Sequence, residues 1–323
     1  MPFDYQKLPK PFFSLAPMED ITDRVFRQLV TTLGRPDVFY TEFQSAKAIS
    51  AKRRTTMDAL NFSSEERPLI AQIWGNQPEE FYQAASLLAE MGYDGIDINL
   101  GCPVRKIVKK GSCAGLIGEY ERCRELFQAV REGTAAAGYP QLPVSIKTRS
   151  GQQSHNTEEW CGFLLGLKPA ALTLHPRTVV QQYEGLADWH QILILSELRQ
   201  QIHPDCVIIG NGDVSSRQDG LERAARYKID GVMIGRAAIQ QPWIFADSNG
   251  ATTPPLASRA KIALEHTIRY ESEYGERRNF MRLKRFYKAY LESADNKELM
   301  AKLMDSVNYT EAKSILGTIS DKH

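Results

Sequence analysis

The 323-residue chain is nearly neutral, with 40 Lys and Arg residues against 39 Asp and Glu residues, and 42% of its residues are hydrophobic. This composition is typical of a soluble globular protein, and the length accommodates one barrel of about 250 residues plus a smaller domain. No apolar run is long enough to span a membrane, and the start MPFDYQKLPKPFF lacks a signal-peptide core. We therefore expect a cytoplasmic protein without a membrane partner, in which any nucleic-acid partner meets a local basic patch.

The cysteine content argues against two kinds of cross-link. The chain has an odd number of cysteines and no C-x-x-C pair: Cys102, Cys113, Cys123, Cys161 and Cys206. This pattern fits neither a disulfide framework nor a structural zinc site. We therefore expect no bound metal.

Eight apolar segments recur along the first part of the chain, and each ends in a polar or glycine-containing signature. They are residues 12–18, 38–43, 69–75, 95–103, 143–151, 171–178, 206–213 and 230–236. Helical patterns separate them, and alternation of this kind predicts an α/β fold, a (β/α)8 TIM barrel with its site at the carboxyl ends of the strands. We assign residues 1–250 to this barrel.

The fourth segment ends in the sequence Asn-Leu-Gly-Cys-Pro. Apolar residues alternate up to Leu100, and Gly-Cys-Pro then stops the strand, which leaves the thiol of Cys102 at its carboxyl end. The alternative is a buried structural cysteine, the commonest fate of a free thiol. The basic segment 104–115 that follows is expected to be a loop, either a lid over a substrate or a solvated connector.

The fifth segment brings two cations to one side of a strand. Lys147 and Arg149 are two residues apart, so their side chains point the same way. Burying two unpaired cations is costly. They therefore either hold anionic or carbonyl-rich ligand groups or pair with carboxylates such as Asp97 and Glu42.

The last three strand ends predict a binding site for phosphate. His175 and Arg177 are two apart on the sixth segment, the seventh ends in the turn Gly-Asn-Gly-Asp (210–213), and the eighth ends in Gly235-Arg236. Glycine-bearing turns at the seventh and eighth strands are where this fold commonly binds phosphate on backbone N–H groups. The chain has no G-x-G-x-x-G sequence, so a tightly bound dinucleotide is not indicated.

The sequence changes character after Phe245. Residues 247–255 have the composition of a linker, and the rest lacks strand patterns, so we expect residues 251–323 to form an all-α helical domain. Within it, residues 277–288 (RRNFMRLKRFYK) hold six basic residues and no acidic one. On a single helix these would form one basic side, which is either a polyanion-binding face or simply a solvated one.

Taken together, the motifs resemble those of the tRNA-dihydrouridine synthase family over nearly the whole chain from Ala16. The matching segments are APMEDITD (16–23), TEF (41–43), Gln72, INLGCPVRK (98–106), IKTR (146–149), HPRT (175–178), GNGD (210–213) and GRAAIQQPWIF (235–245). The resemblance implies a flavoenzyme that binds FMN on a TIM-like barrel, and we expect a monomer. Such an enzyme uses NADPH or NADH as a transient reductant and reduces the C5–C6 double bond of selected uridines in tRNA. The helical domain would help to hold the RNA.

The resemblance also implies roles for individual residues. The flavin ring would be lined by Ala16, Pro17 and Met18 and contacted by Gln72, Lys147 and His175. The FMN phosphate end would be held by Asn211, Gly212, Asp213, Gly235 and Arg236. The uracil or its phosphate would be touched by Asn99, Arg149 and Arg177, and the tRNA backbone by Arg278, Arg282 and Arg285.

Cys102 takes the role of the acid in this family. Hydride from reduced FMN would reach C6, and Cys102 would deliver a proton to C5. A thiol with the usual pKa of about 8.5 is mostly protonated at neutral pH and suits this task. The chain departs from the family pattern at two positions. Cys113 is a second cysteine in a segment that usually has none, and Gln240 stands where glycine is common. We expect Cys113 to be dispensable for protonation.

Three competing functions explain fewer residues. A flavoenzyme that reduces a free pyrimidine base leaves the basic segment 277–288 and the helical domain without a task. A flavin-free lyase with Lys147 as its Schiff-base amine does not use Cys102. A tRNA-binding protein with an inactive barrel would not need Cys102, Lys147, His175 and Arg236 together.

Overall fold

The computed structural model describes residues 3–246, 253–293 and 296–320. It divides into two compact units, which we call the barrel unit (Met1–Glu19 with Pro36–Gly235) and the helical unit (Asp20–Arg35 with Arg236–His323). Residues 20–35 thus group with the C-terminal helices, although they lie inside the segment 1–250 that we assigned to the barrel. The boundary that we expected between residues 250 and 251 lies outside the described residues, as does the predicted linker up to residue 252.

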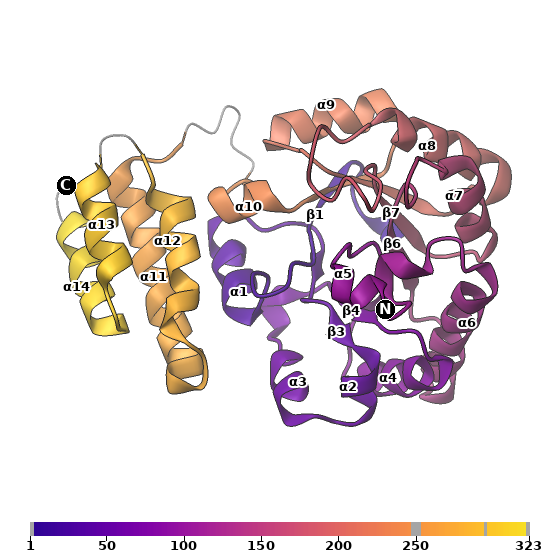
Figure 1. The fold of residues 1–323 in the computed structure, drawn as a ribbon, viewed down its shortest axis with the longest axis horizontal. Coiled ribbons are helices and arrows are strands. Elements are labelled where there is room, and N and C mark those ends of the chain that lie inside the picture. The colour runs from indigo at the N-terminus through magenta and orange to yellow at the C-terminus, as the bar shows by residue number, and fades with distance from the viewer. Residues whose placement is uncertain (1–2, 247–252, 294–295, 321–323) are drawn as a thin grey trace. The chain divides into compact units, whose positions relative to one another are not determined.

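The barrel unit is built on a parallel sheet (Figure 1). Its strands are β1 (Phe12–Leu15), β2 (Phe39–Tyr40), β3 (Gln44–Ser45), β4 (Leu69–Trp74), β5 (Gly95–Leu100), β6 (Val144–Arg149), β7 (Ala171–His175), β8 (Val207–Asn211) and β9 (Gly231–Ile234). Their order is β1-β9-β8-β7-β6-β5-β4-β2, with the short β3 also on β4. A parallel bridge between Ser14 and Val38 joins β1 to the residue before β2 and so closes the ring. The predicted eight-stranded barrel is confirmed.

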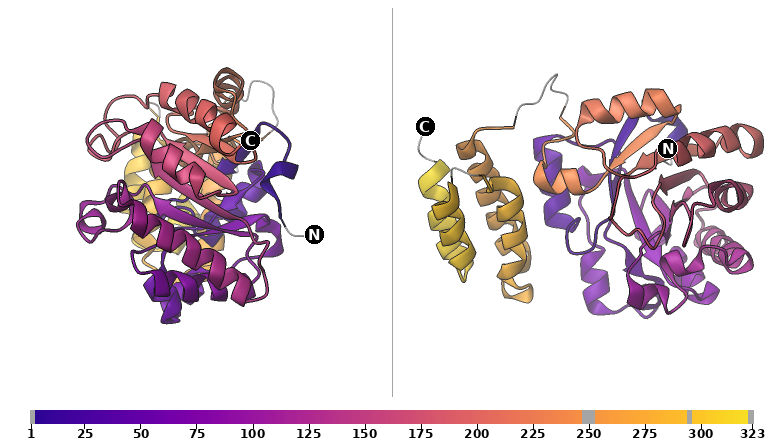
Figure 2. Two further views of the ribbon diagram at one scale, coloured as in Figure 1. Left: turned by 90° about the vertical axis from the view of Figure 1, so that its right-hand side faces the viewer. Right: turned by 45° about the horizontal axis from the view of Figure 1, so that its top comes forward.

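Helices connect successive strands and surround them, as two further views show (Figure 2). They are α2 (Ala46–Ser50), α3 (Arg54–Ala59), α4 (Pro78–Glu90), α5 (Arg105–Val108), α6 (Tyr120–Ala136), α7 (Thr157–Gly166), α8 (His190–Ile202) and α9 (Arg217–Tyr227). Short 3-10 turns are η1 (Tyr5–Lys7), η2 (Ser64–Glu66) and η3 (Cys113–Leu116). Helix α4 starts at Pro78 with two glutamates in its first turn, where proline and negative charge favour a helix start.

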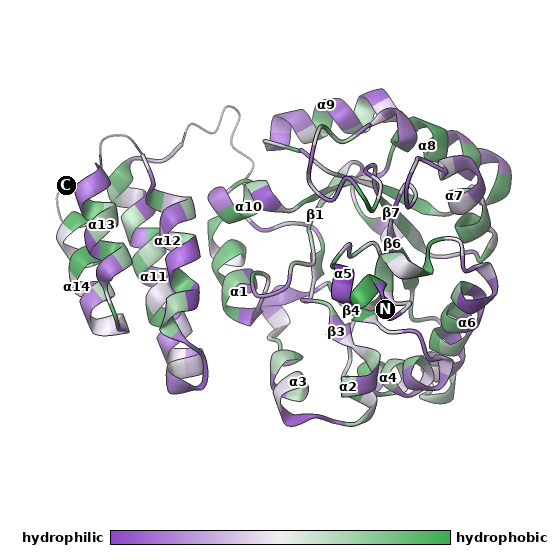
Figure 3. Ribbon diagram, in the orientation of Figure 1, coloured by the Kyte–Doolittle hydropathy of each residue, from purple (hydrophilic) through white to green (hydrophobic). Residues whose placement is uncertain are grey.

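The barrel interior is apolar at its amino end and polar at its carboxyl end. A cluster of buried side chains that includes Phe12, Ile70, Ile209 and Met233 fills the amino end. Tyr5 of η1 packs into this cluster, and its hydroxyl hydrogen-bonds that of Tyr40 at 3.0 Å. Outside, the visible face of α9 is largely hydrophilic (Figure 3). Because side chains fill the amino end of the barrel interior, the polar side chains inside the barrel gather where the strands exit.

The described part of the helical unit is all-α. Its helices are α1 (Arg24–Leu33), α10 (Arg236–Gln240), α11 (Leu256–Tyr274), α12 (Lys284–Leu291), α13 (Lys297–Asp305) and α14 (Tyr309–Ser320), with 3-10 turns η4 (Gly275–Arg277) and η5 (Phe280–Leu283). Its core is aromatic: Phe286 stacks on Phe26 with ring centroids 5.5 Å apart and meets His266 edge-on at 4.6 Å. Among the helices described in either unit, none has the length and hydropathy that crossing a bilayer requires.

The prediction that residues 277–288 form one basic helix is wrong. Helix α11 ends before Gly275, which has a φ of +49°, a conformation that favours glycine. The chain then makes η4, and the side chain of Asn279 accepts a hydrogen bond from the Met281 N–H at 2.8 Å to start η5. Helix α12 begins only at Lys284. The basic side chains therefore do not share the face of a single helix.

Candidate active site

The exit of β5 is organised by the side chain of Asn99. Its Oδ1 accepts hydrogen bonds from the backbone N–H groups of Gly101 and Cys102, both at 3.0 Å. An Asn side chain that bonds to backbone groups two and three residues ahead stabilises a turn. This turn places Cys102, which is partly exposed, at the carboxyl end of the strand, as the sequence predicts.

Cys102 has a second thiol as its neighbour. Cys113 begins η3, is fully buried, and is held close by a hydrogen bond of 3.4 Å from the Ala114 N–H to the Cys102 carbonyl. The hydrogen bond between the two thiols, and then burial, raises the Cys113 pKa well above its ordinary value, and the same hydrogen bond is the main cause that lowers the Cys102 pKa to about 7. The expectation of an ordinary thiol pKa at Cys102 is therefore corrected. The signal was in the sequence, since Cys113 is a departure from the family pattern.

Lys147 lies beside Asn99 in the register of β5 and β6. Its Nζ donates to Asn211 Oδ1 at 3.0 Å, and Asn211 in turn donates to the Met233 carbonyl at 2.9 Å. Burial, and then the charge of Arg149, lowers the Lys147 pKa to about 8. Among the described residues Lys147 makes no ion pair with Asp97 or Glu42, although the charge of Asp97 acts on it from a distance and partly opposes the lowering of its pKa. Its remaining N–H groups suit an anionic or carbonyl-bearing ligand.

Arg149 is fixed by backbone carbonyls. Its Nε donates to Gly101 at 2.9 Å, and its Nη1 donates to Thr178 at 2.9 Å and to Gln182 at 2.8 Å. Burial lowers the Arg149 pKa to about 10. Within the described part of the chain it has no carboxylate partner, and its Nη2 has no protein acceptor. Arg149 therefore ties the Cys102 turn to the loop after β7 and keeps one donor for a ligand.

His175 and Arg177 are brought together by the end of β7. Arg177 Nη1 lies 3.1 Å from His175 Nε2, while its Nη2 donates to the Gly185 carbonyl and to Asp213 Oδ2, both at 2.6 Å. A guanidinium group only donates, so Nε2 of His175 accepts and the ring proton is on Nδ1. Arg177 thus bonds to His175, the Gly185 carbonyl and Asp213 within the protein. Its contact with the substrate stays a prediction.

Glycine stands where the turns after β8 and β9 pack closely against neighbouring residues. Gly212 has a φ of +125°, and a Cβ there would lie 2.9 Å from the His175 ring. A Cβ at Gly235 would touch Ala16 and Met18 at 3.5 Å, so the exits of β1 and β9 meet at this glycine. Backbone N–H groups without side chains in front of them bind phosphate well. These residues fit the phosphate end of a flavin nucleotide, and Arg236 follows directly as the first residue of α10.

The family model for dihydrouridine synthases (Dus) matches residues 14–322. The chain belongs to this family. A probable tRNA-dihydrouridine synthase of Staphylococcus aureus (strain COL) is 38% identical over 317 residues, which cover 97% of this chain and 94% of the relative. A probable tRNA-dihydrouridine synthase 2 of Bacillus subtilis (strain 168) is 36% identical over 324 residues, covering 99% of this chain and 97% of the relative.

One residue of this dihydrouridine synthase site was not assigned from the sequence. Asp97 is fully buried on β5 and accepts hydrogen bonds from Gln72 at 2.7 Å and from Ser145 at 2.6 Å. Burial raises the Asp97 pKa to about 6, although both hydrogen bonds and the charge of Lys147 oppose the change. Its position two residues before Asn99 on a buried strand was the available signal, because alternate residues face the same side.

Two of the three arginines of segment 277–288 that were expected to contact tRNA are paired with carboxylates. Arg278 Nη1 lies 2.8 Å from Asp23 Oδ2, Arg282 forms an ion pair with Asp20, and Arg285 donates to the Asp20 carbonyl at 3.4 Å. The positive charge of segment 277–288 is therefore partly compensated, contrary to the prediction. The local sequence did not reveal this, because the two carboxylates lie about 250 positions earlier in the chain. The contact of these arginines with tRNA stays a prediction.

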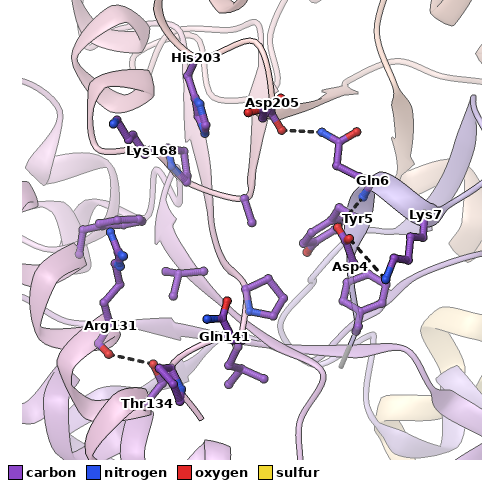
Figure 4. Close-up of a pocket in the computed structure, with 18 residues that line it drawn as sticks. Asp4, Tyr5, Gln6, Lys7, Arg131, Thr134, Gln141, Lys168, His203 and Asp205 are labelled. Carbon is purple, nitrogen blue, oxygen red and sulfur yellow. Dashed lines mark hydrogen bonds and ion pairs between the residues drawn. The ribbon is translucent and has the colours of Figure 1, made fainter. Parts of the chain in front are cut away.

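A cavity of about 480 Å³ lies away from this site, at the amino ends of β6, β7 and β8. Its lining carries charges of both signs, from residues that include Asp4, Arg131, Lys168, His203 and Asp205 (Figure 4). None of the predicted site residues lines it. Barrel enzymes place their chemistry at the opposite end of the strands, so we do not assign this cavity to the active site. In the described part of either unit, no cluster of three or more His, Cys, Asp and Glu side chains is arranged to hold a metal.

Proposed function

We propose that this protein is an FMN-dependent tRNA-dihydrouridine synthase that reduces the C5–C6 double bond of uridine in tRNA, with NADPH or NADH as reductant. The observation that carries the proposal is the Cys102 thiol, fixed by Asn99 at the exit of β5 and hydrogen-bonded by Cys113. Membership of the dihydrouridine synthase family supports the same conclusion.

The exits of the barrel strands suit FMN. Bound and reduced, FMN would supply the hydride that adds to C6 of the uracil ring. Lys147 has N–H groups left to donate to the carbonyl-bearing side of the flavin ring, and its positive charge would offset negative charge there. The backbone N–H groups of Gly212 and Gly235 would bind the phosphate, and Arg236 would supply a countercharge.

Cys102 would deliver the proton to C5 on the other face of the ring. A general acid works best when its pKa is near the working pH, and the Cys102 pKa of about 7 meets this condition. After the transfer, the thiolate would be stabilised by the hydrogen bond from Cys113 and by the nearby charge of Arg149. The thiol form is restored by a proton from solvent, since Cys102 is partly exposed.

Uracil would be oriented by donors next to Cys102. Arg149 Nη2 has no protein acceptor in the described structure and would donate to a uracil carbonyl. A base stacked inside folded RNA is out of reach of a thiol at a barrel mouth, so the target uridine would have to leave its stack. The remaining exposed cations of the helical unit would then meet the tRNA backbone.

The test is to incubate the purified protein with NADPH and with tRNA from cells that lack the gene. We expect flavin absorption in the preparation, and a mass gain of one H₂ at defined uridines of the tRNA. A colourless protein would favour the lyase alternative. Reduction of free uracil but not of tRNA would favour a free-base reductase. Either result would contradict the proposed function.

A further inference from the structure

A chain of side-chain hydrogen bonds runs from the interior of the barrel to the turn that holds Cys102. Gln72 Nε2 donates to Asp97 Oδ2 at 2.7 Å, and Asn99 Nδ2 donates to Gln72 Oε1 at 2.9 Å. Asn99 Oδ1 then accepts the N–H groups of Gly101 and Cys102. The three side chains are 0%, 1% and 6% exposed for Asp97, Gln72 and Asn99, so water does not readily replace any of these bonds.

The two ends of this chain fix the direction of every bond in it. At the turn, two backbone N–H groups can only donate, so Asn99 must present its oxygen there. The Asn99 NH₂ group therefore faces Gln72, and the Gln72 side-chain oxygen must accept the hydrogen bond from it. Gln72 then turns its NH₂ group inward, and an ionised carboxylate, which only accepts, is the group that matches it. Asp97 supplies that acceptor.

We infer that Asp97 is a positioning residue for Cys102, acting through Gln72 and Asn99. Its importance for the reaction rests on the proposed function. Without an acceptor at Asp97, the buried Gln72 NH₂ group has no partner, so the Gln72 amide is no longer held in the orientation in which its oxygen accepts from Asn99. The Asn99 side chain then loses the bond that orients it, so its Oδ1 is held less firmly against the Gly101 and Cys102 N–H groups and the turn that aims the thiol is loosened.

Two neighbours of Asp97 sharpen this assignment. Ser145 Oγ donates to the other oxygen of Asp97 at 2.6 Å, which orients the carboxylate, and the Tyr5 hydroxyl donates to Ser145 at 3.5 Å. Lys147 does not pair directly with Asp97 and donates to Asn211 instead. Asp97 is therefore more than a counter-ion, because its direct partners are the hydroxyl and the amide of the chain.

The experiment measures hydrogen exchange at the amides of Gly101 and Cys102 by mass spectrometry, on the full-length protein saturated with FMN. The variants are Asp97→Leu, Gln72→Leu, the double variant with both changes, and Asp97→Asn. The matched control is Asp230→Leu, which removes another buried carboxylate, bonded to Arg199 and to the Ile208 N–H at the amino end of the barrel. Rates of tRNA reduction are measured on the same samples.

We expect Asp97→Leu to speed exchange of the two amides by about tenfold or more, because a buried donor loses its partner. The rate of tRNA reduction falls by a similar factor, and the KM for tRNA is unchanged. Asp97→Asn stays within about threefold of wild type, because its carbonyl can still accept from Gln72 while Ser145 reverses its hydroxyl. The Asp230→Leu control loses stability without a selective change at Gly101 and Cys102.

The double variant keeps the test decisive if Asp97→Leu does not fold. It removes both partners of the buried hydrogen bond, a change that folded proteins tolerate better than the loss of one. We expect its exchange rates to equal those of Gln72→Leu, because the chain is already cut at Gln72. Faster exchange in the double variant than in Gln72→Leu, or unchanged exchange in Asp97→Leu, would overturn the inference. Because exchange needs no substrate, a wild-type enzyme that fails to reduce tRNA would reject only the proposed function.

Discussion

The exits of the barrel strands and the basic segment of the helical unit were both expected to offer cations to a ligand, and they differ in how those cations are held. In the barrel, Lys147 and Arg149 bond only to neutral oxygens and keep N–H groups free. In the helical unit, Arg278 and Arg282 are paired with carboxylates. A cation that is rigidly held without a countercharge is prepared for an anionic or carbonyl ligand. A cation with a carboxylate partner already contributes to the fold.

The largest effect that separates the two regions is expected at Arg149. Arg149→Gln should lower the rate of tRNA reduction by about 10²-fold or more, the usual cost of removing one donor aimed at developing charge. FMN content should stay near wild type, because the free Nη2 is assigned to uracil. Steady-state kinetics and flavin absorption measure the two quantities. A rate within a few-fold of wild type would show that this cation serves only the fold.

In the helical unit, the corresponding change should act on stability. Arg278→Gln leaves the buried Asp23 carboxylate without its ion-pair partner and should cost about 2–3 kcal/mol of the free energy of unfolding. Urea unfolding followed by circular dichroism measures this loss. The double variant Arg278→Gln with Asp23→Asn is the control and should recover part of it. If Arg278→Gln is as stable as wild type but binds tRNA poorly, Arg278 is a free RNA contact after all.

In the helical unit, His266 makes the free energy of unfolding depend on pH. Burial is the main cause that lowers its pKa from 6.5 to about 3 in the folded state. The unfolded chain binds a proton below about pH 6.5 and the folded chain does not, so the free energy of unfolding falls as the pH drops from about 6.5 toward 3. At pH 5 the loss is about 2 kcal/mol. His266→Phe should remove this loss in an acid titration followed by circular dichroism. An unchanged acid midpoint in the variant would exclude His266 as its cause.

Substitutions of Cys113 test whether its hydrogen bond lowers the pKa of Cys102. In Cys113→Ala the hydrogen bond to Cys102 is lost, so the apparent pKa of Cys102 should rise from about 7 toward its ordinary value of 9.0. Cys113→Ser keeps a hydroxyl donor and should leave the pKa closer to wild type. The alkylation rate of Cys102 against pH measures both. Identical profiles for the alanine variant and wild type would contradict a role for Cys113.

The smallest effect is expected at Arg285, which is exposed and, within the described residues, bonds only to the Asp20 backbone carbonyl. Arg285→Gln should leave stability unchanged and reduce the log–log salt slope of tRNA binding by about 0.7 to 0.9, the value for one phosphate contact. Binding measured across a salt series tests this. An unchanged slope would move RNA docking to α5 and the two residues after it, which carry Arg105, Lys106, Lys109 and Lys110.

The barrel and its exits could be predicted because their signals are local. Strand patterns stop at Gly-Cys-Pro and Gly-Asn-Gly, so the positions of Cys102 and Gly212 follow from neighbouring residues. The pairing of Arg278 with Asp23 could not be predicted, because the two residues are far apart in the chain and only folding brings them together. The break in segment 277–288 does have local signals, because Gly275 ends α11 and Asn279 caps η5. The basic and apolar spacing of residues 277–288 fits a single helix and hides these signals.

The most direct measurement compares Cys102→Ala with wild type in one tRNA-reduction assay. We expect the variant to keep its FMN and to oxidise NADPH at close to the wild-type rate, because Cys102 is not assigned to either step. It should form almost no dihydrouridine, because no other side chain is assigned to protonate C5. A Cys102→Ala enzyme that reduces tRNA at the wild-type rate would show that the thiol at the exit of β5 is not the acid.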